Sequence, residues 1–200
     1  MAEQKTPLEE FFAAFEAQFS GSPQTSRSLA MLAMAERWRG LFVYYDQVAK
    51  LPQRISEVLD RTWEGLFTFE EHPVLMQDLG NAVPGEDWVV DGLVDSVIQY
   101  GAVLIDCALA FQRGEGKGTP EHYSFEIIRL FLCDKWFGAT ELGFGEENTA
   151  FEERLVADRW FVEERRFIEE ALRRAPSAPM DMAGFRNWAT SHAVDVSGLV

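Results

Sequence analysis

Basic residues are missing from the middle of this chain. Between Arg61 and Arg113 there is no lysine or arginine, although the same stretch holds nine acidic residues. The whole chain has 18 basic and 33 acidic residues, a formal net charge of −15. Because such a charge repels phosphates, we expect neither a nucleic acid nor a membrane as partner. A basic protein, a cation or a neutral small molecule is compatible with it.

Cysteine and histidine are scarce as well. Cys107 and Cys133 each lie in an apolar helical pattern, which is typical of a buried thiol rather than of a disulfide. Only His72, His122 and His192 occur, and none forms the Glu-x-x-His pair of di-metal bundles. No serine lies in a G-x-S-x-G turn. The sequence therefore predicts no metal, no cofactor and no catalytic residue.

Long apolar runs are also lacking. The N-terminus has no basic leader, and no segment reaches about 20 uninterrupted apolar residues, the length of a membrane span. We therefore expect a cytoplasmic protein. With 47% hydrophobic residues in 200, the chain can bury one core and is short for two ordinary domains. The sequence predicts a single domain over residues 1–200.

Apolar residues recur at intervals of three and four, and no alternating strand pattern occurs, so the predicted fold is all-α. We expect a bundle of about six to eight helices around a central buried helix at 86–113, which is apolar on nearly every side. Residues 1–22 form an N-terminal helical arm, and 176–200 a short C-terminal helix and tail. The other predicted helices span about 28–50, with a cap at Ser26 or Ser28, 51–69, 74–80, 121–142 and 148–174.

Acidic residues follow one side of the central helix. Asp87, Asp91 and Asp95 are spaced by four, and Asp106 lies eleven residues beyond Asp95. Such like charges repel one another, so they face solvent, a basic neighbour, a metal or a partner. We expect the acids up to Asp95 to be exposed. The candidate partner-binding residues are Glu64, Glu70, Glu71, Asp87, Asp91 and Asp95.

Asp106 stands apart because it lies within the apolar run GAVLIDCALAF. Buried acids are almost always paired, so we expect an ion pair with Arg37, Arg39 or Arg129. The alternative is that Asp106 forms the polar floor of a cleft between the second, third and central helices. The candidate cleft residues are Glu36, Arg37, Trp63, Glu64 and Asp106.

Three segments resemble one known family. AERWRGLFVYY at 35–45, LDRTWEGL at 59–66, and VPGED leading into DGLVDSVIQYGAVLIDCA at 83–108 are similar to the YjaG-like family of bacterial helical proteins, a domain of unknown function. The resemblance covers roughly residues 30–174. It implies a compact, all-helical, cytoplasmic bacterial protein and supplies no reaction or catalytic residues.

Three functions are compatible with these features. We favour a non-enzymatic module that recognises a basic partner through the acidic stretch at 64–95, as inhibitors and immunity proteins of basic toxins do. The alternative is a small-molecule or metal-binding enzyme that uses the carboxylate-lined cleft. The third is a scaffold homodimer, whose contact would be the aromatic arm from Pro7 to Phe19.

Overall fold

The computed structural model describes residues 6–65, 71–83, 92–118, 120, 122–137 and 149–197. Within these ranges the chain forms α-helices, one 3-10 helix (η2) and no strand, so the all-α prediction is confirmed. The elements are α1 (Pro7–Ser20), α2 (Gln24–Arg37), α3 (Arg39–Ala49), α4 (Ile55–Gly65), α5 (His72–Ala82), α6 (Gly92–Gln112), α7 (His122–Phe137), α8 (Thr149–Ala157), α9 (Arg159–Arg174), η2 (Ala175–Met180) and α10 (Met182–Ser191).

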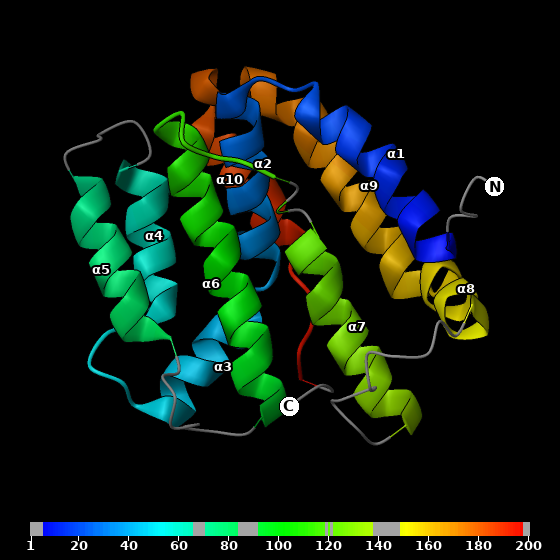
Figure 1. Cartoon of the computed structure of the whole chain (residues 1–200). Helices are drawn as coiled ribbons and strands as arrows, with labels where there is room; N and C mark the ends of the chain where they lie inside the picture. The colour runs from blue at the N-terminus through cyan, green and yellow to red at the C-terminus, as the bar shows by residue number, and fades with distance from the viewer. Residues whose placement is uncertain are drawn as a thin grey trace.

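The helices pack into one bundle with two distinct edges. Helices α4 and α5 lie along one edge, and α1, α8 and α9 lie along the opposite edge (Figure 1). Helices α2 and α6 run between these edges and make the most extensive helix–helix contact among the described residues. The two edges therefore offer separate surfaces on either side of a shared core.

Two predicted helices are each divided in two, which gives more helices than the expected six to eight. The expected helix at 28–50 is interrupted at Trp38, where φ is −95° and ψ is 8°. The expected helix at 148–174 is interrupted at Asp158, whose backbone is extended and whose carboxylate accepts a hydrogen bond from Trp160 N at 2.8 Å. Asp158 thereby satisfies one of the free N–H groups that begin α9.

Helix α2 shares the centre of the bundle with α6. Every residue from Ser28 to Glu36 is buried, whereas α6 exposes Gln99 and leaves Asp106 half-buried. The predicted cap at Ser26 or Ser28 is wrong, because α2 already begins at Gln24, after Pro23, and both serines lie inside the helix. The hydroxyl of Ser28 instead donates to the Ala108 carbonyl of α6 at 2.7 Å. Helix α6 is the buried helix predicted at 86–113, of which residues 86–91 lie outside the described residues, and α2 is buried beside it.

Helix α6 is positioned by close packing. Among the described residues it is the one helix long and apolar enough to cross a membrane, a property that core helices of soluble proteins share, and 56% of its apolar window is buried in the bundle. At Gly101 the ring of Phe42 from α3 lies so near that a Cβ would be 2.4 Å from Phe42 Cε1. Any larger residue would therefore force the buried ring of Phe42 to shift, so glycine suits this close contact between α3 and α6.

The aromatic side of α1 packs within its own chain. Phe15 and Phe19 are fully buried, and the ring of Phe11 lies edge-on to Phe125 of α7 at a centroid distance of 5.0 Å. The apolar surface of Phe15 and Phe19 is therefore already covered within the chain, and the homodimer contact of this arm stays a prediction.

Candidate functional site

The junction between α2 and α3 carries four consecutive polar or amphipathic side chains. Glu36, Arg37, Trp38 and Arg39 are buried or half-buried, and each makes polar contacts with a part of the chain distant in sequence. Because successive residues on a helix point about 100° apart, these side chains reach different neighbours. Two buried carboxylates organise the contacts, one at Glu36 and one at Glu164.

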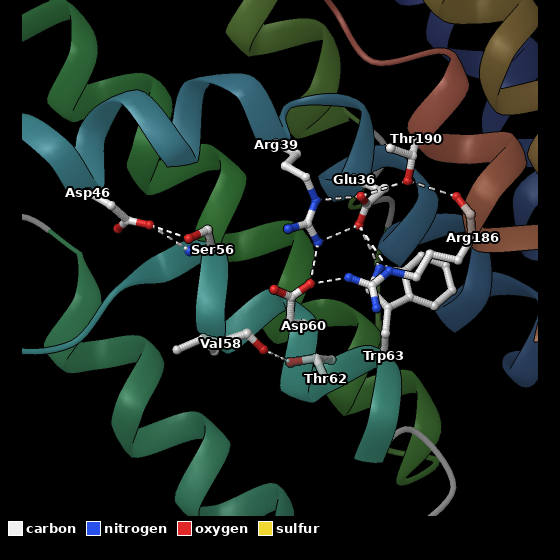
Figure 2. A network of polar contacts seen from close by, with 10 residues as sticks. All are labelled: Glu36, Arg39, Asp46, Ser56, Val58, Asp60, Thr62, Trp63, Arg186 and Thr190. Carbon is white, nitrogen blue, oxygen red and sulfur yellow. Dashed lines mark hydrogen bonds and ion pairs between the residues drawn. The ribbon is translucent and has the colours of Figure 1, made fainter. Parts of the chain in front are cut away.

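The Glu36 network joins four helices (Figure 2). One carboxylate oxygen of Glu36 accepts hydrogen bonds from Arg39 Nε at 2.5 Å and Thr190 Oγ1 at 2.9 Å. The other accepts from Arg39 Nη2 and from Trp63 Nε1, both at 2.9 Å, and lies 3.8 Å from Arg186 Nε. With four donors, the buried carboxylate ties α2 to α3, α4 and α10.

Asp60 completes this network at its solvent-facing edge. Its Oδ1 accepts from Arg39 Nη2 at 2.7 Å and also from Arg186 Nη2. Burial would raise the pKa of Asp60, but the hydrogen bonds and charges of Arg39 and Arg186 bring that pKa below its ordinary value. The side chain of Asp60 is 42% exposed, compared with 1% for Glu36. Two arginines thus balance two carboxylates, as expected of a structural tie.

The Glu164 network lies on the other side of the junction. Glu164 is fully buried and accepts from Arg37 Nε and from Ser124 Oγ, each at 2.5 Å. Ser124 Oγ in turn accepts from the indole N–H of Trp38 at 3.1 Å. Arg37 Nη1 also donates to the His192 carbonyl at 2.5 Å. This network therefore ties α2 to α7, α9 and the segment after α10.

The sequence predictions did not include Glu164, although its spacing to apolar neighbours indicates a buried position. It lies three residues after Phe161 and four before Ile168, both of which are buried. On a helix these spacings share one side, so Glu164 belongs to the apolar side of α9. An acid at such a position predicts a buried, paired carboxylate.

The candidate cleft residues do not form a single site. Glu36, Arg37 and Trp63 belong to the buried networks, and Glu64 is exposed at the end of α4. Asp106 lies elsewhere, in a hollow between α5 and α6. The predicted arrangement fails because a helix presents Glu36 and Arg37 to different neighbours.

The predicted ion pair of Asp106 with an arginine is also wrong. Asp106 makes no hydrogen bond or ion pair with any residue that the structure describes, and Arg37 and Arg39 are held in the two networks. Arg129 pairs with a carboxylate of its own helix at 2.6 Å. Burial raises the pKa of Asp106, while the positive charge of Arg113 acts in the opposite direction.

The candidate partner-binding acids divide into three groups. Glu64 and Glu71 are exposed, as expected. Asp95 is fully buried, which contradicts the expectation that it faces solvent. A spacing of four shows which acids share a side of a helix but leaves open what packs against that side. The remaining candidates, Glu70, Asp87 and Asp91, lie outside the described residues.

Tyr45 is buried near Asp95 and Asp46. Its hydroxyl forms no hydrogen bond with a described residue. Burial raises the pKa of Tyr45 to about 12, and the negative charges of Asp95 and Asp46 contribute to the same shift. A buried hydroxyl without a partner gives up its hydration without compensation.

Replacing Tyr45 with phenylalanine is therefore expected to leave stability at pH 7 unchanged or higher. A raised folded-state pKa gives stability that is fully present below pH 10 and is lost as pH rises toward 12. Each pKa unit corresponds to about 1.4 kcal/mol, so wild type should lose about 1 kcal/mol between pH 10 and 11 relative to Tyr45→Phe. Urea unfolding at both pH values measures this loss, and Tyr44→Phe should behave as wild type. Equal losses in wild type and Tyr45→Phe would contradict the assignment.

Among the described residues, no group of three or more histidine, cysteine, aspartate or glutamate side chains is arranged to hold a metal ion. The structure thus defines a helical bundle with two buried carboxylate–arginine networks and an apolar hollow beside α6. Comparison of the chain with protein-family models, curated proteins and solved structures finds no match. The resemblance to the YjaG-like family stays a prediction.

Proposed function

We propose that this protein is a non-enzymatic module that binds a basic partner protein through the side formed by α5, α6 and the end of α4. We call this surface the base-poor side, because residues 62–112 contain no lysine or arginine. Helices α4 and α5 form one edge of the bundle, and α6 packs against both of them (Figure 1). The stretch without bases thus belongs to helices that are neighbours in space, and this observation carries the proposal.

The cations that border the base-poor side are already paired. Arg61 contacts Asp78 at 2.5 Å, and Arg113 contacts Glu115 at 2.7 Å. Glu64 and Glu71 are exposed and have no basic partner among the described residues. Their negative charge is therefore free to attract a positive surface, which raises association rates and favours basic partners.

Helix α9, at the opposite edge of the bundle, has a different charge pattern. Acids and bases alternate along α9 and form ion pairs at the i, i+4 spacing, which cancel one another locally. These pairs are Arg159–Glu163, Arg165–Glu169 and Arg174–Glu170. The exposed acids of α9 are thus largely neutralised by their neighbours, whereas Glu64 and Glu71 are not.

Reversing both exposed acids, in the variant Glu64→Lys/Glu71→Lys, is expected to weaken binding of the basic partner at least about tenfold. The partner would first be captured from the native host at low salt and identified, and its affinity then measured by calorimetry at two salt concentrations. Wild-type affinity should fall as salt rises, because exposed charges are screened.

The control variant is Glu10→Lys/Glu153→Lys, which changes the net charge equally on exposed residues of α1 and α8, at the opposite edge. Its affinity should stay within about twofold of wild type, since these charges lie beyond a Debye length from the base-poor side. If both double variants lose affinity equally, only net charge matters and the proposed surface is wrong. Capture of acidic proteins alone would contradict the function itself.

A further inference from the structure

A hollow of about 410 Å³ lies between α5 and α6. Met76, Leu79 and Val83 line one wall, and Ala102 and Val103 line the other. This volume lies in the range of small-molecule sites, which are mostly apolar with a few polar groups. The walls are therefore suited to the hydrocarbon part of a small ligand.

Two polar side chains, Gln99 and Asp106, complete the lining. They are seven residues apart on α6, which places them on one side of the helix and about 10 Å apart along its axis. Ala102 and Val103 lie between them. The hollow therefore has a charged end, an apolar middle and a neutral polar end.

Asp106 gives this hollow its chemical preference. The carboxylate is half-buried and makes no hydrogen bond or ion pair with a described residue. Arg113, whose charge reaches Asp106, is itself paired with Glu115 at 2.7 Å. A carboxylate beside apolar groups loses hydration that a bound cation would replace. An anionic ligand would instead be repelled.

We infer that the hollow between α5 and α6 binds a small organic monocation with an aliphatic body, its ammonium group on Asp106 and its chain along Ala102 and Val103 toward Gln99. The single carboxylate favours one positive charge, since a second ammonium group would meet only the neutral Gln99. The length of the hollow suits a chain of about six carbons. The hollow lies on the base-poor side, but the inference rests on Asp106 and the apolar walls and does not require the basic partner.

The test uses three probes that share a six-carbon chain and differ in the head group: hexylammonium chloride, hexanol and sodium hexanoate. Binding to the full chain is measured by calorimetry. Wild type should bind hexylammonium at least about tenfold more tightly than hexanol, as expected for a partly desolvated ion pair, and hexanoate more weakly than hexanol. Asp106→Asn should remove the preference for hexylammonium over hexanol. Glu64→Gln, which removes one exposed charge from the same side, should keep that preference.

A second pair of variants tests the position of the chain. A Cβ at Gly80, which lines the hollow, would meet no atom within 4 Å, so Gly80→Leu fills the space without a clash at its Cβ. This variant should lose binding of all three probes, whereas Asn81→Leu, on the exposed neighbour, should bind as wild type. Circular dichroism checks that both variants fold.

Three results would overturn the inference: no hexylammonium binding by wild type, unchanged preference in Asp106→Asn, or hexanoate bound as tightly as hexylammonium. The variant Glu64→Lys/Glu71→Lys should still bind hexylammonium, because neither residue lines the hollow. Failure of the basic-partner proposal and failure of this one are therefore distinguishable.

Discussion

Replacing Glu164 with glutamine is expected to lower the free energy of unfolding by about 3–5 kcal/mol. Glu164 is the carboxylate that neutralises Arg37, whose side chain is only 12% exposed. Without it, the guanidinium would be left with the His192 carbonyl, a neutral acceptor. A nearly buried charge without a counter-charge is among the largest destabilising changes in proteins. Urea unfolding at pH 7, followed by circular dichroism, measures the loss.

The neighbouring residue supplies a matched control. Glu163 carries the same charge on the same helix, but it is 40% exposed, and its partner Arg159 is 85% exposed. Glu163→Gln should therefore cost about 1 kcal/mol or less. Adding Arg37→Met to Glu164→Gln should recover part of the stability, because no unpaired charge remains. A Glu164→Gln variant as stable as Glu163→Gln would contradict a buried ion pair.

Replacing Glu36 with glutamine is expected to lower the free energy of unfolding by about 3 kcal/mol. The change removes the charge that Arg39 and Arg186 share, and it replaces one of the two oxygens that accept from Trp63 and Thr190 with an amide N–H₂. Arg39 keeps its contact with Asp60, so the loss falls at the lower end of the range for broken buried pairs. Urea unfolding again gives the difference.

Asp60→Asn tests whether burial decides the size of this effect. Asp60 contacts the same two arginines, Arg39 and Arg186, but its side chain is 42% exposed. Water can therefore replace much of what the substitution removes, and the expected loss is about 1 kcal/mol. If Asp60→Asn and Glu36→Gln lower the free energy of unfolding equally, the number of charges removed, and not their burial, determines the stability of the network.

Helical periodicity predicted the fold class and most of the helices, but it did not predict where two of them break. No glycine or proline stands at Trp38 or Asp158. The turn at Trp38 places its indole N–H on Ser124, 86 residues away, so a tertiary contact accompanies the break. The break at Asp158 has a local cause, since its side chain caps α9. Aspartate is a preferred N-cap residue, so Asp158 could have predicted a helix start. The apolar pattern continues on both sides of it and favoured one long helix instead.

For the candidate site, the spacing of the acids predicted which of them share a side of the helix. It did not predict which of them are buried. Asp95 and Asp106 are eleven residues apart, about 20° from alignment on an ideal helix. Asp95 is nevertheless buried, close enough to Tyr45 of α3 to raise the pKa of its hydroxyl, whereas Asp106 borders an open hollow beside α5. The neighbours of a long helix change along its length, and periodicity carries no information about them.

The two networks at the α2–α3 junction also set an order for folding. Glu164 lies 127 residues after Arg37, and Thr190 lies 154 residues after Glu36. During synthesis, α2 leaves the ribosome long before α9 and α10 exist. At that stage Arg37 lacks Glu164, and Glu36 has Arg39 and Trp63 but lacks Thr190. Such long sequence separations also make closing the core entropically slow. The two networks are therefore complete only after α10 has been synthesised.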